Sequence, residues 1–227
     1  MKLLPLIALG ALCLIPPAAS AQNPPAQITY TFENQRLQPS SYTLVLHEDG
    51  SGRFDSLPGP ASVDASDEQV APARLDRDIH ISDSLRTELF QYARAHHFFA
   101  GKCDRGQKKL AFTGKRTLTY AGPDGHGTCD FDWASDATLQ RLSDQLVSVA
   151  YTLEIGRRLD VELKHNRLSL DAELENLQST AKDQRAAGLD NIAPVLEAIA
   201  GDDAVMQRAR YRARTLLNAA AGETAHR

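Results

Sequence analysis

The chain has 227 residues, with 25 Lys and Arg against 29 Asp and Glu, and its formal net charge is −4. This mildly acidic balance argues against nucleic acid as the main partner, because binding to phosphates needs a basic face. The length suits one domain of ordinary size or one domain with a helical appendage, and it can bury a real core.

The first residues have the features of an export signal. One cation, Lys2, precedes the apolar run LLPLIALGALCLI, and the small residues Ala19-Ser20-Ala21 follow. The run is shorter than the roughly 20 residues that span a bilayer. We therefore expect residues 1–21 to be a cleaved signal peptide and the protein to be periplasmic or secreted, without spanning the membrane. Acylation at Cys13 is an alternative, which the large preceding residue disfavours.

Alternation of apolar and polar residues predicts strands near the start of the remaining chain. The expected inward residues are Ile28, Tyr30 and Phe32 of one strand and Tyr42, Leu44 and Leu46 of the next. Asp49-Gly50 then indicates a hairpin, because both turn positions must accept positive φ. Residues 55–77 are rich in Pro, Ser, Ala and Asp, which predicts a solvated loop, with a binding loop as the alternative.

A short strand and one helix are expected before the first cysteine of this part. Asp78–Ile81 is the candidate strand, and Ser82 offers an N-cap for an amphipathic helix that ends near His97. We expect the next two residues, Phe98 and Phe99, to end the helix with their rings in the core.

The segment from Cys103 to Cys129 is the predicted organising element of the domain. A strand over 110–120, a Gly-rich turn over 122–127 and a returning strand form an expected antiparallel hairpin. Its predicted inward residues are Leu110, Phe112, Gly114, Arg116, Leu118, Tyr120, Cys129, Phe131 and Trp133.

Cys103 and Cys129 are the two cysteines that remain after signal removal, and in an oxidising compartment an even pair predicts a disulfide. Such a bridge contributes roughly 3–4 kcal/mol when unstrained. The alternative is a zinc site that adds His126 and either His96 or His97, although the spacing lacks a C-x-x-C or H-x-x-x-H pattern.

The remaining chain reads as helical. Ser135 or Asp136 caps a long helix, and leucines at spacings of three and four mark further helices up to residue 220. The run Arg208, Arg210, Arg212 and Arg214 spreads charge around the last helix, which favours a solvated, partly ion-paired surface.

We predict an α+β fold, a mostly antiparallel sheet with helices packed on one face, followed by an α-helical C-terminal extension. The expected division is a signal peptide over 1–21, a disulfide-stapled domain over 22–163 and the extension over 164–220.

Three residues are candidates for ligand binding. Arg116 lies in alternation with inward apolar residues, so it either sits buried with a carboxylate partner or packs its stem at a sheet edge with its head in water. Asp124 and His126 lie in the hairpin turn, where Asp130 and Asp132 also gather. A calcium loop pattern is absent there, so no metal is predicted.

No catalytic residue or cofactor is predicted, because the sequence lacks a nucleophile elbow, a zinc-protease motif and a phosphate-binding glycine loop. The segments TYTF, YTLVLHEDGSGRF, HHFF and KKLAFTGKRTLTYAGPDGHGTCDF, within residues 28–150, resemble uncharacterised secreted bacterial domains of unknown function. This resemblance implies an exported α+β domain and transfers no site residue. We expect a non-catalytic interaction module that binds an envelope or secreted protein, with a small-ligand or metal-binding protein and an exported hydrolase as alternatives.

Overall fold

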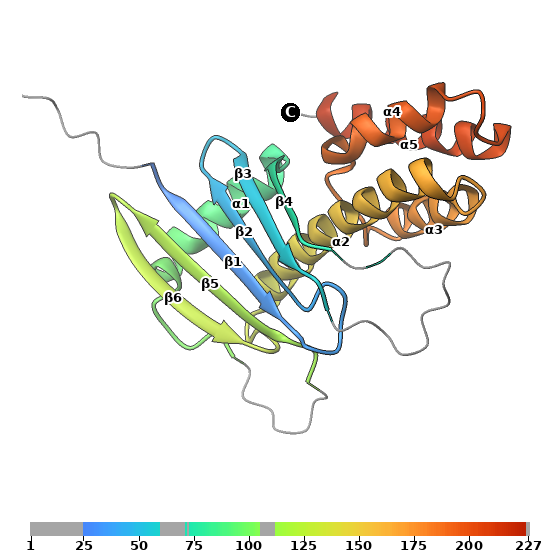
Figure 1. Cartoon of the computed structure of the whole chain (residues 1–227). Helices are drawn as coiled ribbons and strands as arrows, with labels where there is room; N and C mark the ends of the chain where they lie inside the picture. Colours follow the sequence, from blue (N-terminus) through green and yellow to red (C-terminus); the bar gives the residue numbers. More distant parts are fainter. Residues whose placement is uncertain (1–24, 60–70, 72, 105–111, 226–227) are drawn as a thin grey trace, which may run out of the picture.

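The computed structural model describes residues 25–59, 71, 73–104 and 112–225. In these ranges six strands form one antiparallel sheet, α1 and α2 lie on one face of it, and the chain ends in a group of helices (Figure 1). The strands are β1 (Gln27–Glu33), β2 (Ser41–His47), β3 (Ser51–Leu57), β4 (Leu75–His80), β5 (Lys115–Gly122) and β6 (Gly125–Phe131). The helices are α1 (Asp83–Ala95), α2 (Ala137–His165), α3 (Leu170–Lys182), α4 (Ala193–Gly201) and α5 (Gln207–Ala225), with short 3-10 segments η1 (His97–Phe99) and η2 (Leu189–Ile192). The predicted α+β fold is confirmed.

The strands follow the order β4-β3-β2-β1-β5-β6, so the two predicted hairpins, β2–β3 and β5–β6, flank the central strand β1. Burial alternates along each of the central strands, as expected for a sheet covered on one face. One outward row carries hydroxyls across three strands: Thr43 pairs with Thr31, which pairs with Thr117.

The predicted loop over 55–77 is too long at both ends. β3 continues to Leu57 and β4 begins at Leu75. Ion pairs between the two strands replace apolar alternation here, because Arg53 contacts Asp76 at 2.8 Å and Asp78 at 3.1 Å. Such charge pairs support a strand pairing that leaves no hydrophobic period in the sequence. Residues 60–70 and 72 of this loop lie outside the described residues.

The long hairpin strands are also shorter than predicted. β5 begins at Lys115 and β6 ends at Phe131, so Phe112 and Trp133 are exposed instead of buried. The carboxylate of Asp132 accepts hydrogen bonds from the Thr113 backbone NH at 3.0 Å and the Thr113 hydroxyl at 2.7 Å. These side-chain bonds take the place of further ladder pairing. The predicted strand residue Leu110 lies outside the described ranges.

The disulfide prediction is confirmed, because Cys103 and Cys129 are joined with an S–S distance of 2.08 Å. The bond fastens the segment after η1 to β6. The zinc alternative required both cysteines as thiolates, and the bridge removes them.

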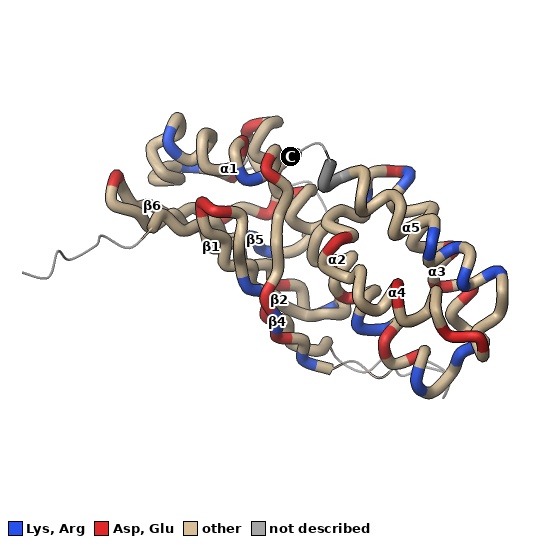
Figure 2. Tube along the Cα trace, turned by 90° about the horizontal axis from the view of Figure 1, so that it is seen from above, with Lys and Arg blue, Asp and Glu red and all other residues tan. Residues whose placement is uncertain are grey.

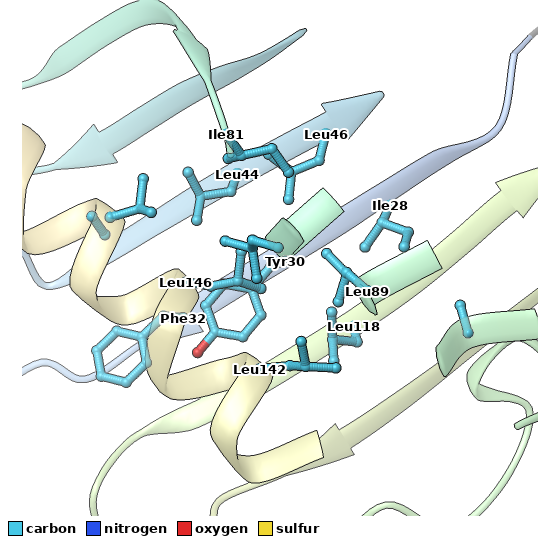
Figure 3. Close-up of a cluster of buried hydrophobic side chains, with 14 of the residues drawn as sticks. Ile28, Tyr30, Phe32, Leu44, Leu46, Ile81, Leu89, Leu118, Leu142 and Leu146 are labelled. Carbon is cyan, nitrogen blue, oxygen red and sulfur yellow. The ribbon is translucent and has the colours of Figure 1, made fainter. Parts of the chain in front are cut away.

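Two helices supply the cover of the sheet. Leu142 and Leu146 of α2 face Tyr30 and Leu118 across the layer (Figure 3). The Tyr30 hydroxyl and the Ser143 hydroxyl lie 3.0 Å apart, so the polar end of the buried ring has a partner. Each fully buried leucine contributes about 1.5–3 kcal/mol from burial.

α2 belongs to two cores. Its residues up to Leu153 pack in the sheet core, and from Ile155 onward they pack in a second core with α3, α4 and α5. One core therefore ends and the other begins between Leu153 and Ile155, inside one continuous helix. The sequence predicted the domain boundary later, at residue 163.

The helical extension also contacts the edge of the sheet. The Asn191 side chain accepts from the His80 backbone NH at 2.7 Å and donates to the His80 carbonyl at 2.8 Å. Asn191 thus hydrogen-bonds to backbone groups of β4 that an edge strand otherwise leaves unpaired. None of the helices in the described part of the chain is long and apolar enough to cross a membrane.

Candidate functional site

The first predicted binding residue, Arg116, is buried inside the sheet domain. Its guanidinium donates to the carbonyl oxygens of Asp132 at 2.5 Å and Gly114 at 3.2 Å, and it lies 5.3 Å from the centroid of the Phe32 ring. β5 lies between β1 and β6, so the interpretation of a sheet-edge arginine with its head in water is wrong. The buried alternative holds, with the Asp132 carboxylate 3.7 Å away.

Asp124 lies at the β5–β6 turn and belongs to a different cluster. It accepts hydrogen bonds of 2.6 Å from both Arg94 and the Tyr120 hydroxyl. Arg94 also pairs with Glu48, which ties the turn to α1 and to the β2–β3 hairpin. The Arg94 hydrogen bond, with that of Tyr120, holds the pKa of Asp124 below its usual value. Burial and the Asp124 contact raise the pKa of Tyr120 to about 12. These interactions fix the position of the turn, so the role of Asp124 in this cluster is structural.

His126 is exposed on the outer face, opposite Ala121 in the register. Arg116 lies five residues before Ala121 on β5 and on the inner face, roughly 17 Å away at about 3.4 Å per residue. The structure therefore does not bring Arg116 together with His126. No group of three or more His, Cys, Asp or Glu residues able to hold a metal occurs among the described residues.

A cleft of 540 Å³ lies on the side of α2 that faces the β1–β2 connection. Its floor is the stacked pair Phe32 and Tyr42, whose ring centroids are 5.1 Å apart. Leu37, Gln38 and Pro39 form the wall on the sheet side. This connection is held in shape by Asn34, whose side chain accepts from the Arg36 backbone NH at 3.0 Å.

The opposite wall comes from one face of α2 and from α3. Lining residues of α2 step by three and four along the helix, as neighbours on one helical face do. They are Val147, Ala150, Tyr151, Glu154, Ile155, Arg158 and Glu162. Arg157 also lines the cleft, as does Glu173 of α3. The wall is therefore apolar toward the start of α2 and charged toward its end.

Two ion pairs fix the charged part of the wall. The Arg157 guanidinium contacts the Glu154 carboxylate at 2.6 Å, and their side chains are only 9% and 15% exposed. Arg158 pairs with Glu173, which links α2 to α3. Hydrogen-bonded pairs of this kind keep buried charges compensated and hold the side chains in place.

Three polar atoms of the cleft lie buried without a hydrogen-bond partner among the described residues. Tyr42 is 6% exposed and Glu162 is 9% exposed. They are the Tyr42 hydroxyl, one carboxylate oxygen of Glu162 and the Nε atom of Arg158. A buried polar atom without a partner costs about 1–3 kcal/mol. The cleft thus contains three groups that a ligand could satisfy.

Burial and the neighbouring Glu173 raise the pKa of Glu162, with a partial offset from Ser169 and Arg158. Burial raises the pKa of Tyr42 well above its ordinary value, so its hydroxyl stays protonated. A perturbed carboxyl in a cleft with convergent polar groups is a recognised feature of ligand and active sites.

A second hollow adjoins the cleft and shares Val147 and Tyr151 with it. This trough has a volume of 1080 Å³ and runs from Trp133 along α2 toward Arg185. None of its lining side chains carries an unpartnered buried polar atom among the described residues. The cleft is therefore the stronger candidate for a binding site.

The sequence reasoning missed the cleft residues. Glu154, Arg158 and Glu162 are spaced by four, so the sequence does indicate a charged stripe beside the leucine stripe of the long helix. Nothing in the local sequence indicated that Tyr42 and the β1–β2 connection would lie opposite this stripe. No model of a known protein family matches the chain, and no curated protein sequence matches it either.

Proposed function

We propose that the protein is an exported binding protein that holds a small organic ligand in the cleft between the β1–β2 connection and α2. The observation that carries the proposal is the pair Tyr42 and Glu162, two buried side chains that line the cleft and have polar atoms without a partner in the described part of the chain. The volume of 540 Å³ lies in the ordinary range for small-molecule sites, and the floor is apolar. This proposal places the site elsewhere than the small-ligand alternative of the sequence, which used Arg116 and the His126 turn.

The export part of the proposal rests on the leader at 1–21, which lies outside the described residues, and on the disulfide. A bridged cysteine pair is typical of proteins that fold in an oxidising compartment.

A neutral fluorescent probe, N-phenylnaphthylamine, tests for the cleft. We expect saturable binding to the wild-type protein. The variant Val147→Trp puts an indole into the cleft wall, and we expect it to weaken binding at least about tenfold, equivalent to about 1.4 kcal/mol. The matched control is Val45→Trp on the outer sheet face, which should leave binding unchanged. Circular dichroism verifies that both variants fold, and the absence of saturable wild-type binding contradicts the proposal.

A second candidate function is the predicted interaction module. It is favoured by the outer face of the sheet, which α1 and α2 leave uncovered (Figure 1). Crosslinking in an envelope extract tests it, because a partner of this face should be lost in Val45→Trp and kept in Val147→Trp. Recovery of no specific partner by the wild-type protein counts against it.

The hydrolase alternative finds less support in the cleft. Its described lining contains Glu162 as a perturbed carboxyl and includes no Ser, Cys or His; Ser169, which partly offsets the pKa rise of Glu162, lies outside the lining. Nucleophilic catalysis of the usual kinds needs such a group with an adjacent base.

A further inference from the structure

The charges that line the cleft do not balance. Three carboxylates, Glu154, Glu162 and Glu173, face two guanidinium groups, Arg157 and Arg158. Each arginine is already engaged, Arg157 with Glu154 and Arg158 with Glu173. Among the described residues, Glu162 has no cation paired with it alone.

Burial makes this imbalance important. Glu162 is 9% exposed, so water compensates its carboxylate poorly. A positive group placed beside it would supply the missing hydrogen bond and the missing charge, and charge-assisted bonds of this type are about twice as strong as neutral ones.

The remainder of the cleft defines what carries the positive group. Phe32 and Tyr42 line the cleft with aromatic rings, and Leu37, which is exposed, adds aliphatic surface. Apolar surface of this kind binds an apolar body, and aromatic faces also attract cations.

Resting on the proposed function of the cleft, we infer that its ligand is an organic amine, with an apolar body on the Phe32–Tyr42 floor and an ammonium group beside Glu162. An anionic ligand could accept a hydrogen bond from the unpartnered Nε of Arg158, but it would add a negative charge to a lining whose carboxylates already outnumber its guanidinium groups. The charge arrangement therefore favours a cation.

Three probes with the same phenyl body test the inference: phenethylammonium, phenethyl alcohol and phenylacetate. Their binding near pH 7 is measured by calorimetry and by shifts in the amide NMR spectrum. We expect phenethylammonium to bind the wild-type protein at least about tenfold more tightly than the alcohol. Phenylacetate should bind most weakly.

Glu162→Gln keeps the shape of the side chain and removes its charge, so we expect the preference for the ammonium probe to disappear. Glu175→Gln is the matched control, because Glu175 is an exposed carboxylate of α3 outside the cleft lining, and the preference should persist. The two variants need not have the same melting temperature at the titration pH. Both must give dispersed NMR spectra, which show that they are folded.

The outcomes separate the two proposals. Equal binding of the ammonium and alcohol probes in the cleft overturns the amine inference and leaves the binding function standing. Tighter binding of phenylacetate also overturns it and points to Arg158. Loss of the preference in Glu175→Gln as well shows a nonspecific charge effect and overturns the inference. Binding by none of the probes contradicts both the inference and the proposed function.

Discussion

Arg116 has its guanidinium inside the protein and depends on fixed partners there. Its hydrogen bonds to the Asp132 and Gly114 carbonyls and its contact with Phe32 hold the start of β5 against β1 and the segment after β6. We expect Arg116→Ala to lower the free energy of unfolding by about 2–4 kcal/mol, because it leaves buried acceptors without a donor. Urea unfolding measures the change. The neighbouring Lys115→Ala, on the outer face, should cost less than about 1 kcal/mol, and equal losses in the two variants would contradict the account.

Glu162 gives the fold a specific pH dependence. Its ordinary carboxyl pKa of 4.5 is raised in the folded protein. Between 4.5 and the raised pKa, the folded state holds more protons than the unfolded state, so the free energy of unfolding falls as the pH rises through this window. Below the window this penalty is absent, and above it the penalty is complete.

We therefore expect the free energy of unfolding of Glu162→Gln, relative to that of the wild-type protein, to increase when the pH is raised from about 4 to about 7. Urea unfolding at both values measures the difference, with Glu175→Gln as the control for a general loss of charge. A pH dependence of Glu162→Gln identical to that of the wild type would show that this carboxyl is not perturbed.

The residue patterns that could be read from the sequence were those with a local cause. Alternation predicted β1 and β2, and the Asp-Gly and Gly-rich turns predicted both hairpins. The sequence left two interpretations of Arg116, buried or at a sheet edge. Its burial depends on β1 and β6 pairing with β5 on both sides, which the local pattern does not reveal. The cleft was missed for the same reason, since Tyr42 and Glu162 are far apart in the chain and only tertiary packing brings them to one cavity.

Among the elements, η1 is held in an unusual backbone conformation. His97, Phe98 and Phe99 have φ values of 53°, 57° and 66°, in the left-handed region that costs L-residues about 1–2 kcal/mol each. Two glycines of β6 allow this segment to lie against the strand. A Cβ atom at Gly127 would be 2.4 Å from the Phe98 carbonyl oxygen, and one at Gly125 would be 2.2 Å from the Phe98 ring.

We expect Gly127→Ala to destabilise the protein by about 2–3 kcal/mol, because the clash is with backbone that cannot move independently. Thermal unfolding measures the effect. Gly101→Ala is the control, since no heavy atom lies within 4 Å of a Cβ atom placed there. If Gly127→Ala were as stable as Gly101→Ala, the close packing of η1 on β6 would be refuted.

The contact between η2 and β4 is the link by which the helical extension reaches the sheet edge. Asn191→Ala removes the bonds to both backbone groups of His80. We expect a loss of about 1–3 kcal/mol and faster hydrogen exchange of the His80 amide. Asn176→Ala removes one exposed bond, to the Tyr151 hydroxyl, and should have little effect on either measurement. Unchanged exchange at His80 in Asn191→Ala would contradict the docking.

In α5, the four arginines predicted as a partly ion-paired surface do have acceptors. Arg208 and Arg212 both contact Asp171, Arg210 contacts Asp203, and Arg214 donates to the Ala200 carbonyl. Basic and acidic residues are interspersed over this part of the molecule (Figure 2). The charges therefore join the helices of the extension to one another.

At the scale of the whole molecule, a disulfide fastens one side of the sheet domain while α2 joins its core to that of the helices. Reduction should lower the melting temperature, with a loss of roughly 3–4 kcal/mol from loop entropy. The double variant Cys103→Ser/Cys129→Ser should match the reduced protein and be insensitive to reductant. Free-thiol titration of the freshly isolated exported protein should find none, and two thiols would refute the bridge.

The cleft between the β1–β2 connection and α2 is the ligand site that we propose for this protein. Mapping of amide NMR shifts during titration with phenethylammonium tests it most directly. We expect the largest shifts at Phe32, Tyr42, Ile155 and Glu162, which line the cleft. Shifts confined to the trough beside Trp133 or to the outer face around Thr31 would contradict it.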